Sequence, residues 1–549
     1  MCNTMTIRYE VRNGKRYAYK CTSKRMPDKP YPVSQKEYLG VVDEDTGNII
    51  PKKVSSDEQK FMLKDKGFSV KDYGNVITVA KVVDDLHIGE DLSNSFGSSS
   101  LAMNAMAMAQ AMNPTALMDT QITMDNSFIR ETVGLGDMTF PSQRISEMVR
   151  IIGEATGCMD DLFSLRAKRS ADGMFLYDIT SQSTYSDMNG WAEFGHNRDG
   201  EKLKQMNIGL VTDREGIPVA FDIFPGSISD TTTLKRFSDD MRRRCPGCVL
   251  VMDRGFENAG NVRRLTDDGI EFIMPCNINT KTMKTLLTDF SSDVTRPEYD
   301  KRHNGHVYSV KEHTLGIVED DGGCRYISHV DEGFEGSVKV KVFVCFDSKK
   351  RSDDEQELKN ALIDKINELD GKRFRDPAKQ FADATGWMSK YLEYEANDDG
   401  TIHVVHKANA MAFFRNRAGM FIMISSSDID WETVMTSYDA RDNVEKAFDV
   451  YKNELDGKRG RTGDPIRARG RFFIKFIALM IRVRMQNIIA RSKIRELTVE
   501  NALMTLGTYK IIDSGDRYVR TERSKRVREI FGLFGVEDPE EIPHPKLRG

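Results

Sequence analysis

Cysteine is scarce in this chain of 549 residues: there are eight, and only Cys245 and Cys248 lie close together. A single Cys-x-x-Cys pair lacks the second pair of ligands that a structural zinc site needs, and the other cysteines are scattered. This pattern excludes the usual structural zinc site and gives no sign of a disulfide framework. We therefore expect a reducing, cytoplasmic environment.

Long apolar runs are also absent. The longest, Phe472–Ile481, is interrupted by Lys475 and is far shorter than the roughly 20 residues that a membrane span needs. The basic block over residues 1–26 is not followed by the apolar stretch of a secretory signal. The sequence therefore predicts a buried helix at 472–481, a soluble protein that is not exported, and no membrane partner.

Neither sign of charge is in excess. Lys and Arg total 80 against 84 Asp and Glu, which gives a formal net charge of −4. This balance excludes a uniformly basic nucleic-acid coat but allows local basic stripes. Charged residues make up 30% and hydrophobic residues 39% of the chain, as in globular proteins, and the length allows about three or four domains.

The first 170 residues fall into two predicted parts. Residues 1–93 are expected to be β-rich, with short strand-like runs at Tyr17–Tyr19 and Val76–Val79. Residues 94–170 form a Met- and Ser-rich linker and helical region. We expect the Met/Ala tract in this region to be a packing helix rather than a partner-binding groove, although methionine suits both.

From residue 171 onward, apolar strands alternate with helices, which is typical of an α/β core with a central sheet. The first part of this core is predicted over 171–284, with strands at 174–178, 205–212, 217–224, 248–253 and 271–275 and helices at 230–244 and 262–268. A β-rich insertion with one charged helix (353–369) follows over 285–425. The second part of the core, 426–500, holds helices at 431–455 and 471–490, and a basic C-terminal region spans 501–549.

Two acids, Asp178 and Asp253, stand at the ends of apolar strands. Strand-end acids are often mere loop or helix caps, but sites in α/β sheets form at the carboxyl ends of strands. Two carboxylates on neighbouring strands can hold a hard cation such as magnesium.

The predicted helix at 431–455 carries a more specific pattern. Counted from Tyr438, the offsets of Arg441, Glu445 and Lys452 are 3, 7 and 14, which places all four within a stripe of roughly 60° on an ideal helix. A solvated charged face is the plain alternative, and it accounts for the mixed charges. It does not account for a hydroxyl, a guanidinium, a carboxylate and an ammonium at two-turn spacing beside an apolar side.

In this combination the sequence resembles the DDE transposases of bacterial insertion sequences, in particular the branch with a Tyr-Arg-Glu-Lys signature. Further motifs occur in the same order as in the family. They are Phe175-Leu-Tyr-Asp178, Gly195-His-Asn-Arg-Asp-Gly200, Gly209–Pro218, Phe224-Pro-Gly226 and Val251-Met-Asp253-Arg-Gly255. The turn at His196 and Asn197, the Gly226-Ser227 pair and Arg471 depart from the family pattern, but none of these departures touches the three acids.

The resemblance implies an RNase H-like fold with a mixed sheet, in which Asp178 lies on the first strand and Asp253 on the adjacent fourth. Glu445 would lie on a helix behind them, after the β-rich insertion. The three acids would be catalytic and would hold two Mg²⁺ ions, for which Mn²⁺ can substitute. Tyr438, Arg441 and Lys452 would contact DNA near the scissile phosphate.

The resemblance also implies the reaction and the partners. Cut-and-paste excision and integration would proceed through a hairpin intermediate, on the terminal inverted repeats of the element and on target DNA. A homodimer would hold the two ends, residues 1–93 would recognise them, and the protein would be nucleoid-associated. Trp387 and Trp431 are candidates for stacking a flipped base, although a buried core tryptophan explains either position better.

Basic segments complete the expected DNA footprint. Lys458, Arg459 and Arg461 open a basic stretch directly after the Glu445 helix, and we expect phosphate contacts there. Two other functions remain open: an inactive DNA-binding protein of transposase descent, and a phosphatase with an Asp nucleophile. The phosphatase is disfavoured because Thr180 stands where its second acid should be.

Overall fold

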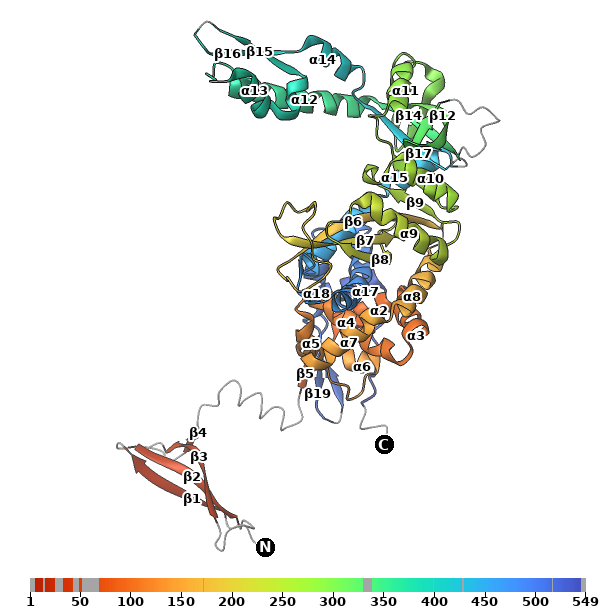
Figure 1. Ribbon diagram of the computed structural model, residues 1–549. Helices are drawn as coiled ribbons and strands as arrows, with labels where there is room; N and C mark the ends of the chain where they lie inside the picture. Colours follow the sequence, from red (N-terminus) through yellow and green to blue (C-terminus); the bar gives the residue numbers. More distant parts are fainter. Residues whose placement is uncertain are drawn as a thin grey trace. The chain divides into compact units, whose positions relative to one another are not determined.

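The structure is a computed structural model that describes residues 5–12, 15–24, 33–42, 49–51, 69–170, 172–328, 338–397, 399–426, 429–515 and 517–544. The chain divides into two units. The smaller comprises residues 1–71, 510–522 and 539–549, and the larger comprises residues 72–509 and 523–538 (Figure 1).

The smaller unit is made of β-structure. One antiparallel sheet has the strand order β1 (Met5–Arg12), β2 (Lys15–Lys24), β3 (Val33–Val42) and β4 (Ile49–Pro51). A second sheet has the order β20 (Tyr518–Arg520), β19 (Lys510–Asp513) and β5 (Ser69–Asp72). The strand predicted at Tyr17–Tyr19 is confirmed, because it lies within β2, where both tyrosine rings pack against Tyr38.

The larger unit begins with a helical region rather than with strands. Its helices are α2 (Gly74–Asp85), α3 (Ile88–Phe96), α4 (Ser100–Met112), α5 (Thr120–Asn126), α6 (Ile129–Val133), α7 (Ser142–Glu154) and α8 (Thr156–Arg169). The strand predicted at Val76–Val79 is therefore wrong, since these residues lie in α2. Val76, Val79 and Val83 are buried at helical spacing, and a run of four residues is too short to show that period.

The Met/Ala tract is a packing helix, as predicted. Met103, Met106 and Met108 of α4 are almost completely buried. This helix packs against α2, α3 and the long helix α17 (Pro465–Ala490). Flexible methionine side chains therefore fill the space between several helices.

The core sheet contains the strand pairs predicted from the sequence. In spatial order its strands are β8 (Pro218–Pro225), β7 (Lys204–Thr212), β6 (Met174–Thr184), β9 (Val249–Met252) and β10 (Glu271–Pro275). Strands β6, β7 and β8 are antiparallel, whereas β9 and β10 run parallel to β6. The first strand of the core therefore lies beside the fourth, as the resemblance implied.

Helices cover this sheet. The predicted helices at 230–244 and 262–268 correspond to α9 (Asp230–Arg244) and α10 (Ala259–Asp267). Phe221 of β8 packs against Phe163 of α8 and Phe476 of α17, with ring centroids 5.3 and 5.2 Å apart. The apolar run Phe472–Ile481 lies within α17 and is buried, as predicted.

The stretch 285–425 contributes to the same sheet. After α11 (Lys281–Ser291), the strand order β11 (Asp300–His303), β12 (His306–Asp320), β14 (Val338–Asp347) and β17 (Met420–Ser425) continues the sheet onto β10, and β13 (Gly323–Ile327) pairs with β12. The β-structure predicted for this stretch is therefore present in β11, β12, β13, β14 and β17.

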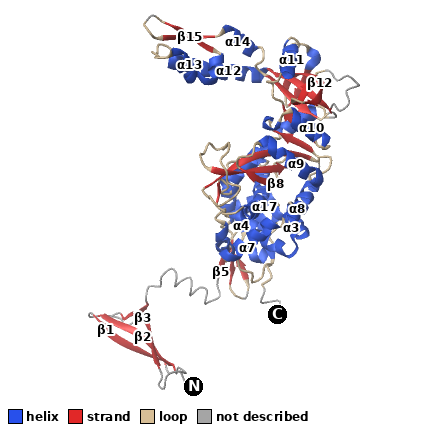
Figure 2. Cartoon of the chain, in the orientation of Figure 1, coloured by secondary structure: helices blue, strands red, loops and turns tan. Residues whose placement is uncertain are grey.

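Residues 348–418 form a separate lobe between β14 and β17 (Figure 2). The lobe contains α12 (Ser348–Leu369), α13 (Pro377–Thr385), the hairpin β15 (Leu392–Ala396) and β16 (Ile402–His406), and α14 (Ala408–Arg415). The lobe has its own apolar core, in which Leu362, Leu392 and Ile402 are buried. The predicted charged helix corresponds to α12.

The helix predicted over 431–455 is interrupted. It consists of α15 (Trp431–Asp439), α16 (Asp442–Asp449) and a π-helical turn at Val450–Glu454. The short strand β18 (Arg459–Gly460), α17, α18 (Val499–Leu506) and α19 (Lys525–Phe534) follow. No helix in the described part of the chain is long and apolar enough to cross a membrane.

Candidate active site

Asp178 lies in the middle of the core sheet, on β6. Its Oδ1 accepts a hydrogen bond from the backbone N–H of Ile179 at 2.8 Å. Burial raises the pKa of Asp178 to about 6, the nearby charge of Asp253 acts in the same direction, and Arg441 and Arg198 oppose the rise. The carboxylate is therefore desolvated yet surrounded by charged groups.

Asp253 directly follows β9, the parallel neighbour of β6. In the register of these two strands, Tyr177 is opposite Met252, so Asp178 and Asp253 are the next residues on each strand. Asp253 also begins the 3₁₀ turn Arg254–Phe256, and its side chain is about half exposed. Two acids distant in sequence thus lie on neighbouring strands at the point where β9 ends.

Glu445 lies on α16, which is fixed to the β7–β8 turn. Asn443 donates a side-chain hydrogen bond to the carbonyl of Arg214 at 2.8 Å. Gly216 has φ +81°, and a Cβ at this position would lie 2.9 Å from the Asn443 carbonyl oxygen. The turn Asp213–Gly216 therefore positions the helix that carries the third acid, and glycine permits both the backbone conformation and the close approach.

Arg441 connects the acids. Its guanidinium forms a short ion pair with Glu445 and lies 4.0 Å from Asp253. Although its own burial acts in the opposite direction, the charges of Asp253 and Glu445 raise the pKa of Arg441. Only 15% of the Arg441 side chain is exposed, whereas the side chains of Asp253 and Glu445 are about half exposed.

Tyr438 completes this group from the last turn of α15. Burial raises the pKa of its hydroxyl, and the charge of Arg441 opposes the rise. The backbone N–H of Arg441 donates to the Tyr438 carbonyl at 2.9 Å, at the break between α15 and α16. The structure therefore brings together Tyr438, Arg441, Glu445, Asp253 and Asp178.

The donors are of the type that a hard divalent cation prefers, because all three are carboxylates near one charged residue. Within the described residues, no group of three or more acidic, histidine or cysteine side chains is already arranged as a metal cage. The guanidinium of Arg441 lies between Asp253 and Glu445, and its positive charge offsets the charges of these two carboxylates. The residues fit a divalent cation in chemistry, and Arg441 would have to move aside from Glu445 as an ion binds.

The family profile for the transposase DDE domain matches residues 166–481. The chain belongs to the DDE transposase family. Membership makes the protein an enzyme that cleaves DNA and transfers strands, and therefore one that binds DNA. The family typically uses divalent metal ions. No curated protein matches the chain.

The match covers the whole core sheet of this transposase, the lobe and most of α17, and it includes the three acids. The phosphatase alternative loses its basis, because the matched domain is a transposase domain. Outside the match lie the N-terminal sheet, most of the helical region before the core and the C-terminal segment.

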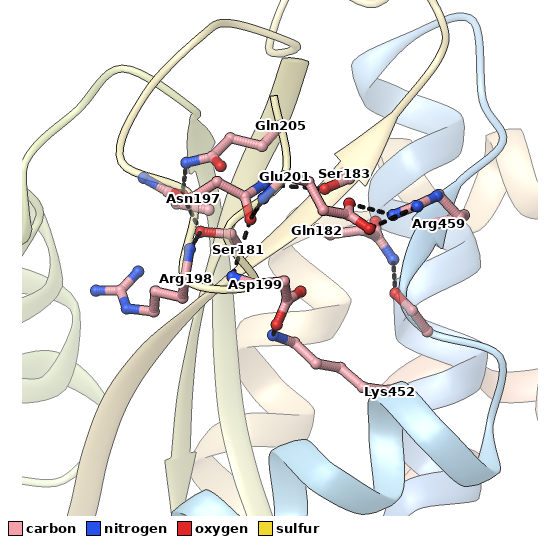
Figure 3. A network of polar contacts seen from close by, with 12 residues as sticks. Ser181, Gln182, Ser183, Asn197, Arg198, Asp199, Glu201, Gln205, Lys452 and Arg459 are labelled. Carbon is pink, nitrogen blue, oxygen red and sulfur yellow. Dashed lines mark hydrogen bonds and ion pairs between the residues drawn. The ribbon is translucent and has the colours of Figure 1, made fainter. Parts of the chain in front are cut away.

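Lys452, the fourth residue of the predicted stripe, lies beyond the helix break, in the π-helical turn of the transposase structure. Its Nζ lies 2.7 Å from Asp199 Oδ1, and only 10% of its side chain is exposed (Figure 3). The helix break at Arg441 and the π-helical turn that contains Lys452 both change the register, because each departs from 3.6 residues per turn. Lys452 therefore faces the loop between β6 and β7.

Arg459 makes a similar contact with the same loop. Its guanidinium forms a bidentate ion pair with Glu201, and β18 pairs with β6 so that Arg459 lies opposite Ser183. Asn197 organises the loop: its Oδ1 accepts from the N–H groups of Asp199 and Glu201, and its amide donates to Ser183 (Figure 3).

The sequence did not identify Asp199 and Glu201 as partners of the predicted DNA-contacting cations. Their only signal is local, an asparagine followed by acids two and four residues later, which is typical of a turn capped by its own side chain. The ion pairs depend on a strand pairing across more than 250 residues, which no short motif shows.

The remaining predicted residues differ in exposure. Lys458 is exposed, and Arg461 lies 3.6 Å from Asp456. Trp431 is buried against Tyr308 and Phe343, so it is unsuited to stacking a base from DNA, whereas 54% of Trp387 is exposed on the lobe. The preferred interpretation, a buried core tryptophan, is therefore confirmed for Trp431 but not for Trp387.

Proposed function

We propose that this transposase belongs to the Tyr-Arg-Glu-Lys branch and moves an insertion sequence by cut-and-paste excision and integration. One observation supports this most directly: Arg441 contacts Glu445 and lies 4.0 Å from Asp253. Asp253 directly follows β9, the strand that pairs with β6, which carries Asp178. The three acids thus lie near the signature residues Tyr438 and Arg441, although they come from separate parts of the sequence.

Asp178, Asp253 and Glu445 are the proposed ligands of two Mg²⁺ ions, with Mn²⁺ as a substitute. Bound ions would supply the charge that activates a water or a 3′-hydroxyl and stabilises the leaving 3′-oxygen. Because its pKa is raised only to about 6, Asp178 is mainly ionised at neutral pH and can serve as a ligand. Its burial keeps it fixed on β6.

The basic and phenolic side chains would position DNA. Arg441 is suited to bidentate contact with a phosphate once Glu445 binds metal, and Tyr438 lies beside it. Lys452 and Arg459 would hold the backbone further along β6, with Lys458 and Arg461 next to them. Each of these contacts neutralises a phosphate, which makes binding dependent on salt.

The proposed partners are the terminal inverted repeats and target DNA. The proposed active form is a homodimer that holds both ends of the element, and its proposed location is the nucleoid. A hairpin intermediate is proposed for the excision step, with Trp387 as the exposed tryptophan able to stack an unpaired base. We propose that the N-terminal region, residues 1–93, binds the ends of the element.

The test is strand cleavage of DNA that carries the repeats flanking the reading frame, with Mg²⁺, Mn²⁺ or EDTA. We expect cleavage only with a divalent ion, and a loss of at least about a hundredfold in Glu445→Gln, which keeps the shape but removes the charge. Asp449→Asn is the matched control, because it is an exposed carboxylate on the same helix.

Equal cleavage by Glu445→Gln and the wild type would refute the three-acid assignment. Binding of the repeats without any metal-dependent cleavage would favour the inactive DNA-binding alternative. A covalently closed product on a denaturing gel is expected from the hairpin step. If all the cleaved DNA ends are open, this step does not occur.

A further inference from the structure

A polar cavity lies between the π-helical turn, β18 and α17. Its volume is about 20 Å³, and it is open to solvent. Four cations line it: Arg459, Arg461, Arg471 and Lys475. Gln182, which donates to the Tyr451 hydroxyl, and Tyr451 itself also line it.

Arg471 and Lys475 are the unusual members of this group. They come from successive turns of α17, where Lys475 is buried and Arg471 is partly buried. Desolvation lowers the pKa of both, that of Lys475 to about 8, and the charge of Asp456 opposes this change. Among the described residues, no carboxylate lies within 4.0 Å of either charged group. Arg461 and Arg459 differ, since they have Asp456 and Glu201 as partners.

The contacts of Lys475 explain why it is buried. Its Nζ donates to the carbonyls of Leu455 and Asp456 at 2.7 Å, and so closes the end of the π-helical turn. Arg471 has no equivalent role, because one Nη1 bond to the Arg461 carbonyl at 3.2 Å uses only a small part of its five donors.

Buried cations are normally paired, because a desolvated charge without a partner is costly. Arg471 and Lys475 line one cavity with the hydroxyl of Tyr451, and no carboxylate is among its lining residues. Asp456, whose charge acts on both cations, lies 3.6 Å from Arg461. A guanidinium matches two oxygens of a phosphate, and several cations suit an anion with more than one charge.

We propose that this cavity binds one phosphate group, with Arg471 as its main ligand and Lys475 as a supporting charge. The phosphate belongs either to the DNA backbone or to free inorganic phosphate. The DNA source rests on the proposed function, since the cavity shares Arg459 and Arg461 with the proposed DNA path, whereas binding of free phosphate does not.

The first arm measures thermal unfolding of the full chain while inorganic phosphate replaces chloride at constant ionic strength. The melting temperature of the wild type should rise and saturate. Arg471→Gln should bind phosphate at least about tenfold more weakly and lose the shift. Arg491→Gln is the matched control: it removes one charge at the end of the same helix, where Arg491 is 63% exposed and pairs with Glu215.

Arg471→Lys keeps the charge and disturbs folding least, so it provides the answer if the glutamine variant does not fold. It should bind phosphate several-fold more weakly, because an ammonium cannot make the bidentate contact. No shift in the wild type, or an equal shift in the wild type and both Arg471 variants, would overturn the proposal.

The second arm distinguishes the two sources with a DNA duplex in EDTA, where no cleavage occurs. If the phosphate belongs to DNA, the slope of log affinity against log salt should fall by about one unit in Arg471→Gln and stay unchanged in Arg491→Gln. An unchanged slope together with a lost phosphate shift assigns the cavity to free phosphate. Neither readout depends on catalysis, so failure of the proposed function is recognised separately.

Discussion

At the scale of single residues, Arg441 explains how the acids can lie together without metal. Two carboxylates near one another repel, and the guanidinium between Asp253 and Glu445 offsets that repulsion. The sequence placed Arg441 beside Glu445 in a stripe on an ideal helix, and the two residues are in contact although the helix is interrupted before Asp442. The residue types of the motif were therefore more informative than the geometry assumed for them.

The ion pair between Lys452 and Asp199 leads to a prediction about DNA affinity. If Lys452 contacts phosphate, it must exchange Asp199 for DNA, so Asp199→Asn should strengthen non-specific DNA binding several-fold. The slope of log affinity against log salt should become steeper by about one unit. Fluorescence anisotropy with a DNA duplex in EDTA, at several salt concentrations, measures both quantities.

The control for this experiment is Asp187→Asn in the same loop. Asp187 is 86% exposed and pairs with Lys204, which is not among the proposed DNA contacts, so its loss should change the net charge with little effect on binding. Weaker binding by Asp199→Asn would contradict the exchange and would instead make Asp199 a positioning residue that holds Lys452 ready for DNA.

At the scale of elements, the sequence predicted the core strands because each is a short apolar run with a turn on either side. It failed at Val76–Val79, where β-branched residues form a helix, and at residues 440–441, where one helix becomes two. In both places packing decides: helix α2 buries its valines against other helices, and Asn443 holds α16 to a distant turn. Local propensity is too weak to show either outcome.

The crossing of α7 and α17 is an element-scale contact that depends on glycine. A Cβ on Gly470 would lie 1.9 Å from the Val149 carbonyl oxygen, so the helices would have to separate. We expect Gly470→Ala to destabilise the protein by about 2–3 kcal/mol, the cost of overpacking that no rotamer change can relieve. Chemical denaturation followed by circular dichroism measures the change.

Gly157→Ala in α8 is the matched control. This glycine is exposed, and a Cβ there meets nothing within 4 Å. The same substitution should therefore stabilise the protein by about 0.5–1 kcal/mol, because alanine loses less entropy in a helix. Similar effects of the two substitutions would show that α7 and α17 are not in such close contact.

At the scale of the whole molecule, the net charge of −4 hides a local distribution. Lys452 and Arg459 meet acids of the β6–β7 loop, and Arg461 lies near Asp456. Arg471 and Lys475 have no carboxylate within 4.0 Å among the described residues. Composition excluded a uniformly basic surface, but it could not show which cations are already neutralised. That depends on strand pairing between distant segments.

The attachment of the lobe to the core sheet is also a feature of the whole molecule. Strands β14 and β17 are antiparallel neighbours, with Phe346 opposite Met420, and the Asp347 N–H donates to the Gly419 carbonyl at 2.9 Å. The 71 residues from 348 to 418 therefore leave and return at one end of a hairpin. Their apolar core involves only lobe residues: Leu358, Leu362, Leu369, Phe381, Leu392, Ile402 and Val404.

A lobe with its own core and a narrow attachment should be removable. We expect that replacing residues 348–418 by an Asn-Gly turn, which suits a two-residue hairpin, leaves a folded protein whose melting temperature lies within about 5 °C of the wild type. In the full chain, Leu362→Asp places a charge in the lobe core and should expose only the lobe to limited proteolysis. Loss of cooperative unfolding on excision, together with cleavage of the core sheet in Leu362→Asp, would show that lobe and sheet fold as one unit.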